Sequence, residues 1–284
     1  MAAESADARN FKRRVTSALV LAPAGILVTY IGGWLFLCVC LVAAAVILWE
    51  WTALAVRTED MRIFVPGMIA LVVAMLLTGA GEPGAAVGMI AIGTVLAGVF
   101  VAAWPRHYPA TNLRFWGAAG VVYAGIAFIP AATLRGDPQL GFAALLFLFS
   151  TVWATDVFAY LTGRAMGGPL LWPALSPKKT WAGAIGGLAG GVAAGTLVAY
   201  AGAGTKPVVA GVLALALSIV AQGGDLFESA IKRRFGAKDA GSLIPGHGGA
   251  MDRLDGFVAA ALLALMIGSL HQSTAAAAQG LSVW

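Results

Sequence analysis

The chain has 284 residues, of which 60% are hydrophobic and only 11% are charged, and its mean hydropathy is +0.86. Because soluble domains usually have about 25% charged residues, this composition excludes an ordinary water-soluble domain and predicts an integral membrane protein. The net charge of +5 lies in short segments between apolar stretches, which favours contact with lipid phosphate over a nucleic-acid partner.

A membrane-spanning helix needs about 20 mostly apolar residues. We predict an all-α polytopic membrane protein with about nine spans, at residues 15–31, 34–50, 63–80, 84–104, 115–134, 141–161, 181–201, 207–223 and 256–271. Only Gly32 and Gly33 separate the first two spans, so a single bent element there is an alternative. Residues 1–140 form an N-terminal set of helices, and residues 141–284 form a C-terminal region that holds the polar segments.

The basic residues predict how the chain is oriented in the membrane. If the N-terminus is cytoplasmic, 16 of the 18 Lys and Arg residues fall in cytoplasmic segments, and only Arg135 and Lys206 fall on the other side. Cytoplasmic segments of membrane proteins are enriched in Lys and Arg. We therefore expect a cytoplasmic N-terminus and an external C-terminus.

Two loops on the predicted cytoplasmic face, residues 162–180 and 223–256, are unusually rich in charge. Together with Asp156 they contain six of the 13 acidic residues and eight of the 18 basic residues. The acids are Asp156, Asp225, Glu228, Asp239, Asp252 and Asp255. A divalent metal needs hard oxygen ligands, and a triphosphate needs cations, so this density indicates metal and phosphate chemistry at one face.

The acids of the second loop are spaced as on helix faces. We expect Asp225 to open a short helix over residues 226–235, with Glu228, Ser229 and Lys232 on the same face. An N-cap role for Asp225 is the alternative. Asp252 and Asp255, three residues apart, enter the last span, where an unpaired carboxylate would be costly.

The remaining polar residues each have two interpretations. Lys178 and Lys179 either bind phosphate or anchor the loop at the membrane face, and the same choice holds for the run 232–234. His247 lies between glycines that allow a close approach to a ligand, although a lone loop histidine is more often structural. Asp156, an acid at a span boundary, is a functional candidate by default.

The stretch from Ser229 to Asp255, SAIKRRFGAKDAGSLIPGHGGAMDRLD, resembles the signature of the phosphatidate cytidylyltransferases at some 13 fixed positions. Gly224-Asp225-Leu226 with Glu228-Ser229 is similar to the start of the same block. Residues 156–163 and Ser176-Pro177-Lys178-Lys179-Thr180 are similar to other segments of the family. The resemblance covers most of the C-terminal half with motifs, and the N-terminal half only as a set of apolar spans.

The resemblance implies an enzyme of the bacterial cytoplasmic (inner) membrane that transfers CMP from CTP to phosphatidic acid, with its active site on the cytoplasmic face. It implies Mg²⁺ held by Asp225 and Asp252, and suggests K⁺ as a second metal. The implied catalytic residues are Asp225, Lys232, His247, Asp252 and Asp255. The implied substrate-binding residues are Asp156, Ser176, Lys178, Lys179, Thr180, Glu228, Ser229, Arg233, Lys238, Asp239, Gly248, Gly249 and Arg253. The expected partners are CTP, phosphatidic acid and membrane lipid, with a homodimer left open.

Two departures from the family pattern and three rival functions bear on this interpretation. Ala250 stands where a larger aliphatic residue is usual, and Ala182 where a Glu is frequent. A catalytically silent scaffold is therefore one alternative, and a transporter is another, although a transporter would place its polar groups near mid-membrane. An enzyme that consumes CDP-diacylglycerol is excluded, because position 260 is Ala and no Asp follows Asp255.

Overall fold

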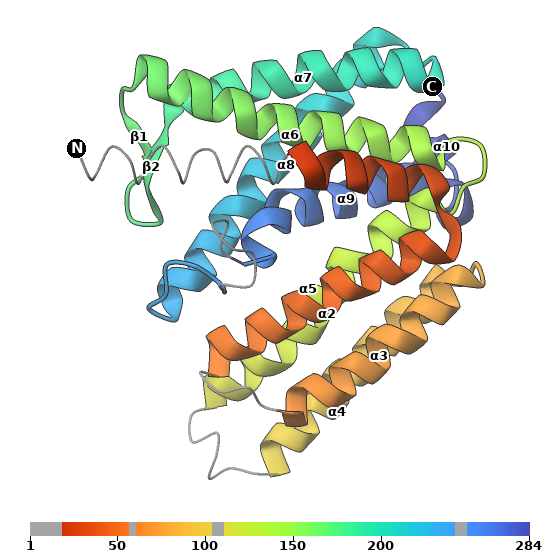
Figure 1. Cartoon of the computed structure of the whole chain (residues 1–284), viewed down its shortest axis with the longest axis vertical. Coiled ribbons are helices and arrows are strands. Elements are labelled where there is room, and N and C mark those ends of the chain that lie inside the picture. Colours follow the sequence, from red (N-terminus) through yellow and green to blue (C-terminus); the bar gives the residue numbers. More distant parts are fainter. Residues whose placement is uncertain (1–18, 57–60, 104–110, 242–248) are drawn as a thin grey trace.

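The computed structural model describes residues 19–56, 61–103, 111–241 and 249–284, without the side chains of residues 111–114. Its secondary structure is almost entirely helical (Figure 1). The helices are α2 (Gly33–Val56), α3 (Met61–Gly79), α4 (Pro83–Ala103), α5 (Thr111–Arg135), α6 (Gly141–Met166), α7 (Trp181–Ala203), α8 (Pro207–Arg234), α9 (Met251–His271), the 3₁₀ turn η1 (Thr274–Ala276) and α10 (Ala277–Ser282). Two short strands, β1 (Leu170–Trp172) and β2 (Ser176–Thr180), complete the description.

Eight of the described helices, α2 to α9, are long and apolar enough to cross a membrane. They correspond to eight of the nine predicted spans, so the all-α polytopic fold class is confirmed. The first predicted span, residues 15–31, is represented within the described residues by a shorter helix, Leu19–Ile31. This helix and α2 are separate elements, because Gly32 and Gly33 adopt φ of +68° and +55° and the chain reverses there (Figure 1).

The helices pack around two hydrophobic cores. One core lies among α2, α3, α4 and α5, and the other among α6, α8 and α9 with α10. Ile231 and Met251, from the two ends of the second polar loop, are buried in the first core, so this loop joins both halves of the protein. The division into residues 1–140 and 141–284 stays a prediction about domains.

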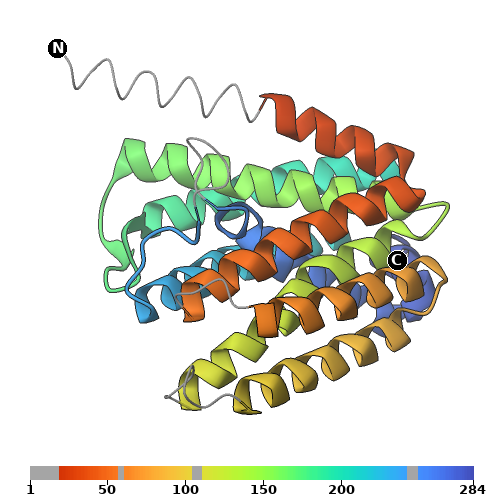
Figure 2. The same cartoon turned by 60° about the horizontal axis from the view of Figure 1, so that its bottom comes forward.

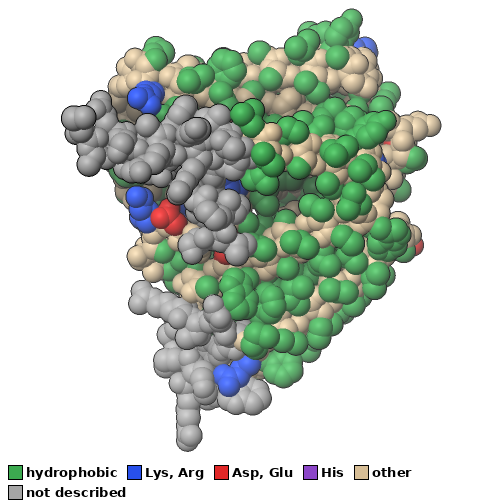
Figure 3. Space-filling model, viewed as in Figure 1, with side chains coloured by type: hydrophobic (Ala, Val, Ile, Leu, Met, Phe, Trp, Pro, Cys, Tyr) green, Lys and Arg blue, Asp and Glu red, His purple; other side chains and the backbone are tan. Residues whose placement is uncertain are grey.

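The two ends of the helices differ in charge. Charged side chains in the visible face gather at the end that holds β1, β2 and the last turns of α8, while apolar side chains cover most of the surface between the ends (Figure 3). The described C-terminal residues lie at the opposite end of the helices (Figures 1 and 2). This arrangement fits a membrane protein whose charged residues are concentrated at one end of its helices. The orientation relative to the cytoplasm stays a prediction.

Two local elements differ from the sequence-based expectation. The loop 162–180 contains an antiparallel hairpin of β1 and β2, with Trp172 paired to Ser176. The helix predicted to begin after Asp225 was wrong as a separate element, because α8 runs unbroken from Pro207 to Arg234 and Asp225 lies inside it. Neither Gly223 nor Gly224 breaks this helix, and the N-cap role considered for Asp225 is excluded.

Candidate active site

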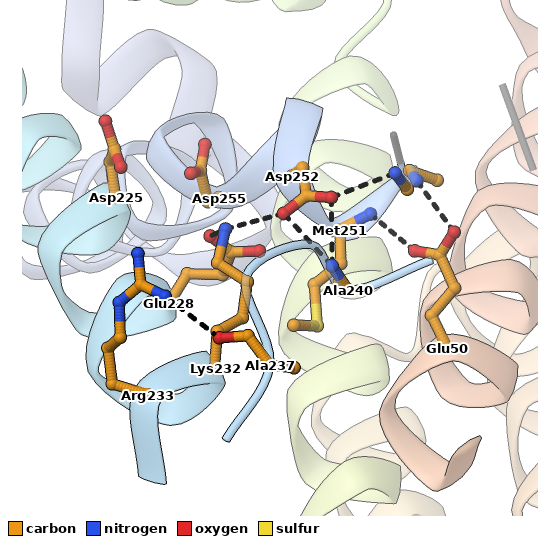
Figure 4. A network of polar contacts seen from close by, with 12 residues as sticks. Glu50, Asp225, Glu228, Lys232, Arg233, Ala237, Ala240, Met251, Asp252 and Asp255 are labelled. Carbon is orange, nitrogen blue, oxygen red and sulfur yellow. Dashed lines mark hydrogen bonds and ion pairs between the residues drawn. The ribbon is translucent and has the colours of Figure 1, made fainter. Parts of the chain in front are cut away.

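Close packing of α8 on α9 brings two carboxylates together. A Cβ atom added to Gly224 would lie 2.7 Å from both the Asp255 carbonyl oxygen and the Ala259 Cβ, so only glycine allows this approach. Asp225 follows Gly224 directly, and Asp255 lies on the facing turn of α9. The helix contact therefore places the Asp225 and Asp255 side chains on the same side of the crossing (Figure 4).

Asp225, Glu228 and Asp255 form a cluster that is suited to a metal ion. One carboxylate oxygen from each of the three lies within 4.8 Å of the other two. Carboxylates this close repel one another unless a cation lies among them. Hard divalent cations such as Mg²⁺ and Ca²⁺ bind oxygen ligands of this kind.

Glu228 provides an independent sign that the cluster is built for a cation. Its side chain is only 1% exposed, and apart from Lys232 and Asp252 its carboxylate oxygens have no hydrogen-bond partner among the described residues. The Glu228 Oε2 forms an ion pair with the Lys232 Nζ at 2.5 Å. A buried carboxylate normally has several partners, so Glu228 has acceptor capacity left for a ligand. The residues of the cluster thus fit a metal ion.

Lys232 links this cluster to Asp252. The Lys232 Nζ lies 2.6 Å from the Asp252 Oδ1 as well as close to Glu228. The Asp252 Oδ2 accepts hydrogen bonds from the backbone N–H groups of Gly249 at 2.9 Å and Ala240 at 3.1 Å (Figure 4). Asp252 therefore holds the Lys232 ammonium group and, through Ala240 and Gly249, the backbone on both sides of residues 242–248.

The three close carboxylates are not the pair expected from sequence to hold a metal, and which carboxylates bind the metal stays a prediction. Asp225 and Asp252 were the expected ligands, but the cluster in the described part of the chain pairs Asp225 with Asp255 and Glu228 instead. The physical reason is that the oxygens of Asp252 already contact one ammonium group and two backbone amides. Asp255, whose Oδ1 accepts from the Gly256 N–H at 2.7 Å, keeps its other oxygen available to face Asp225.

The β hairpin extends the site. Lys179 in β2 forms an ion pair with Asp225, and the next residue, Thr180, caps α7 by accepting from the Gly183 N–H at 3.1 Å. This cap fixes the backbone where the hairpin joins α7, and β2 places Lys179 against Asp225 in α8. Asp156 in α6 lies close enough to Asp225 and Lys179 for electrostatic interaction. Three separate parts of the chain thus meet at one carboxylate.

Most of the other predicted site residues in the described part of the chain are less buried than Glu228 of the carboxylate cluster. Exposed side chains belong to Asp156, Lys178, Arg233, Lys238, Asp239 and Arg253, and partly exposed ones to Ser176, Thr180 and Ser229. Arg233 donates to the Ala237 carbonyl oxygen at 3.2 Å, which holds it near the end of α8. Gly249 is buried and contributes its N–H to Asp252. His247 and Gly248 lie outside the described residues.

Sequence reasoning missed Glu50 in α2. Its carboxylate is 3% exposed and accepts from the backbone N–H groups of Ala250 at 2.9 Å and Met251 at 2.8 Å. An acid inside an apolar helix is rare and is a functional candidate by default, so the signal was present in the sequence. Its partners, 200 and 201 residues away, were not readable from any local pattern.

The fold and the site define a polytopic membrane protein with a carboxylate and lysine centre at one end of its helices, and comparison with known proteins agrees. The profile of the Cytidylyltransferase family matches residues 12–271. The phosphatidate cytidylyltransferase of Brucella abortus biovar 1 (strain 9-941) is 42% identical over 266 residues, covering 92% of this chain and 94% of the relative. That of Staphylococcus haemolyticus (strain JCSC1435) is 36% identical over 204 residues, covering 69% and 76%.

The chain belongs to the Cytidylyltransferase family. The resemblance noted for residues 229–255 is therefore confirmed, and it extends through the N-terminal helices that the motifs did not cover.

Proposed function

We propose that this protein transfers CMP from CTP to phosphatidic acid, which yields CDP-diacylglycerol and pyrophosphate for phospholipid synthesis. The observation with the most weight is the carboxylate cluster of Asp225, Glu228 and Asp255 beside Lys179 and Lys232. It combines metal ligands with ammonium groups at the end of apolar helices, where a lipid phosphate and a soluble nucleotide can meet. The names of the relatives support the choice of both substrates.

The reaction is a single displacement at phosphorus. An oxygen of the phosphatidic acid phosphate attacks the α-phosphorus of CTP and forms a new P–O bond. The bond from that phosphorus to the oxygen bridging to the β-phosphorus breaks, and pyrophosphate leaves with the electron pair. No side chain has to form a covalent bond, so the work of the protein is positioning and charge neutralisation.

The metal would be held by Asp225, Glu228 and Asp255, with Asp252 acting through Lys232. When bound, a Mg²⁺ ion supplies charge neutralisation for the triphosphate and for the pyrophosphate that leaves. Lys232 is fixed between Glu228 and Asp252, so its ammonium group is pre-oriented at the edge of the cluster. The K⁺ suggested as a second metal stays a prediction.

The basic residues around the centre would bind phosphate groups. Lys179 already lies against Asp225, and we propose that it turns to the substrate phosphates when the metal neutralises that carboxylate. Lys178 in β2, Arg233 in the last turn of α8, Lys238 just after α8 and Arg253 in the first turn of α9 are exposed cations. Charge-assisted hydrogen bonds of this kind are the strong ones for phosphate.

The acyl chains of phosphatidic acid would lie against apolar side chains next to the carboxylates. Val157 and Phe158 follow Asp156 in α6, and Phe227 lies two residues after Asp225 in α8. All three are large exposed hydrophobic residues, 54%, 46% and 50% exposed. A lipid can thus approach from the bilayer while its headgroup reaches the centre. We propose that this end faces the cytoplasm of a bacterial inner membrane; a homodimer stays a prediction.

The rival functions fit this arrangement less well. A transporter would gather its polar groups near the middle of several spans, whereas the three carboxylates here lie together with Lys179 of the hairpin and Lys232 of the last turn of α8. A silent scaffold was motivated by Ala182, which lies in the first turn of α7 and outside the carboxylate cluster. The cluster is complete without a side chain at that position.

Pyrophosphate release by the purified protein in phosphatidic acid micelles tests the proposal. We expect release to require CTP, phosphatidic acid and Mg²⁺ together, and ATP not to replace CTP. Diacylglycerol in place of phosphatidic acid is the matched control, since it lacks only the attacking phosphate. Equal turnover with ATP would contradict the cytidylyl assignment, and no turnover under any condition would favour the scaffold.

A further inference from the structure

Glu50 is a buried carboxylate outside the metal cluster, near the cluster end of α2. Each of its two oxygens accepts one hydrogen bond. Oε1 accepts from the Ala250 N–H at 2.9 Å, and Oε2 accepts from the Met251 N–H at 2.8 Å (Figure 4). These amides belong to the N-cap and first residue of α9. The N-cap residue, Ala250, has no side-chain group that could cap this end of the helix.

The contact satisfies two needs of α9 at once. The first N–H groups of a helix have no partner within the helix, and the same end has a partial positive charge that favours an anion. A cap residue usually comes from the preceding loop. Here Glu50 in α2 supplies the contact, so a residue from the N-terminal half of the protein helps to fix the start of α9.

Two glycines are packed on the same carboxylate. A Cβ atom added to Gly241 would lie 2.7 Å from the Glu50 Oε1, and one added to Gly249 would lie 2.7 Å from the Oε2. Gly241 and Gly249 lie at the two borders of residues 242–248, which are outside the described part of the chain. Glu50 therefore lies against the residues on both sides of segment 242–248 as well as capping the helix.

The residues that Glu50 contacts lie next in sequence to residues of the candidate active site. Gly249 and Ala240, neighbours of its contacts, donate their N–H groups to Asp252. Asp252 in turn holds Lys232 against Glu228, and Asp255 follows one helical turn later in α9. A shift of the first turn of α9 would thus reach both the metal cluster and the lysine.

We propose that Glu50 is a positioning residue, which sets the place of Asp252 and Asp255 by holding the start of α9. The effect on kcat rests on the proposed function, whereas the effects on metal affinity and on the start of α9 do not. Substituting a residue that orients metal ligands without touching the metal typically lowers metal affinity or activity by about 10–100-fold.

The test is Glu50→Gln, which keeps the size of the side chain but turns one acceptor into an NH₂ group facing a backbone N–H. We expect Mn²⁺ affinity, measured by the EPR signal of free Mn²⁺ without nucleotide, and kcat each to fall about 10–100-fold. KM for CTP should change less than about threefold, because the Glu50 carboxylate is buried and occupied by two backbone N–H groups. Hydrogen exchange at Ala250 and Met251 should speed up.

Asp137→Asn is the matched control. Asp137 is 5% exposed and accepts from the Gln139 and Leu140 N–H groups at 2.9 and 2.8 Å at the start of α6, at the opposite end of the helices. This variant should lose stability without losing Mn²⁺ affinity. Glu50→Asp, which keeps the charge, should recover part of the loss in kcat.

The outcomes separate the proposal from its alternatives. If Glu50→Gln loses as much stability as Asp137→Asn but keeps its Mn²⁺ affinity and kcat, Glu50 is only structural and the proposal is overturned. If Glu50→Gln does not fold, Gly241→Ala, which presses a methyl group against the same carboxylate, must show the same losses or the proposal fails. An inactive wild type would remove the proposed function and leave the Mn²⁺ and exchange measurements to decide on Glu50.

Discussion

Asp225→Asn and Asp255→Asn should each reduce kcat by about 10²–10³-fold or more, the loss that follows removal of one electrostatic partner of a transition state. Both carboxylates belong to the three-residue cluster, and either loss removes a negative ligand from the same site. The double variant should therefore be hardly worse than either single one, because the effects of groups that act as a unit are not additive.

The folding of these variants should stay intact. Removing one negative charge from three close carboxylates relieves repulsion in the metal-free protein. Glu82→Gln is the matched control, since Glu82 is exposed in the turn between α3 and α4 and lies away from the cluster. Steady-state pyrophosphate release over a Mg²⁺ titration measures the effect. Near-normal Mg²⁺-dependent turnover in either variant would mean that the metal is bound elsewhere.

Lys232→Met should cause the largest loss of stability. It removes the ammonium group that lies between Glu228, which is 1% exposed, and Asp252, and it leaves a buried carboxylate uncompensated. Breaking a buried ion pair in this way costs about 3–5 kcal/mol. Thermal unfolding in detergent should show a decrease in Tm on the order of 10 °C, and saturating Mg²⁺ should restore part of it by neutralising the cluster.

A second substitution, added to Lys232→Met, tests whether the lost stability comes from the uncompensated charge of Glu228. Lys232→Met combined with Glu228→Gln should recover most of the lost stability but stay inactive, because Glu228 no longer carries a buried charge and Asp252 still accepts two backbone hydrogen bonds. Lys206→Met, at the opposite end of the same helix and exposed, is the control and should change Tm little. A Lys232→Met protein as stable as the wild type would show that the ion pairs do not hold Glu228 and Asp252 together.

Hydropathy was sufficient to predict the membrane-spanning helices, because a span of about 20 apolar residues has few alternatives. It was insufficient for α8. The polar residues after Gly223 suggested a new helix, but Gly224 serves the contact with α9 and Asp225 stays within one continuous element. What keeps this stretch helical is tertiary packing, which no local propensity records.

The charged residues of the candidate site could be read from the sequence but their arrangement could not, and their roles stay predictions. Asp252 and Asp255 are three residues apart in one helix, and their spacing does not say which of them meets Asp225. That choice depends on Lys232 and on the backbone N–H groups of Ala240 and Gly249, which engage Asp252. Glu50 escaped notice for a related reason, because its partners lie 200 residues away in sequence.

The transfer of CMP to a lipid is the central claim, and the position of a radiolabel tests it most directly. Purified protein in vesicles that contain phosphatidic acid would be given Mg²⁺ and CTP labelled with ³²P at either the α- or the γ-phosphate. The proposed displacement predicts that the α label enters the chloroform phase as CDP-diacylglycerol, while the γ label stays in water as pyrophosphate. A γ label in the lipid phase, or an α label that remains in water as CMP, would contradict the claim.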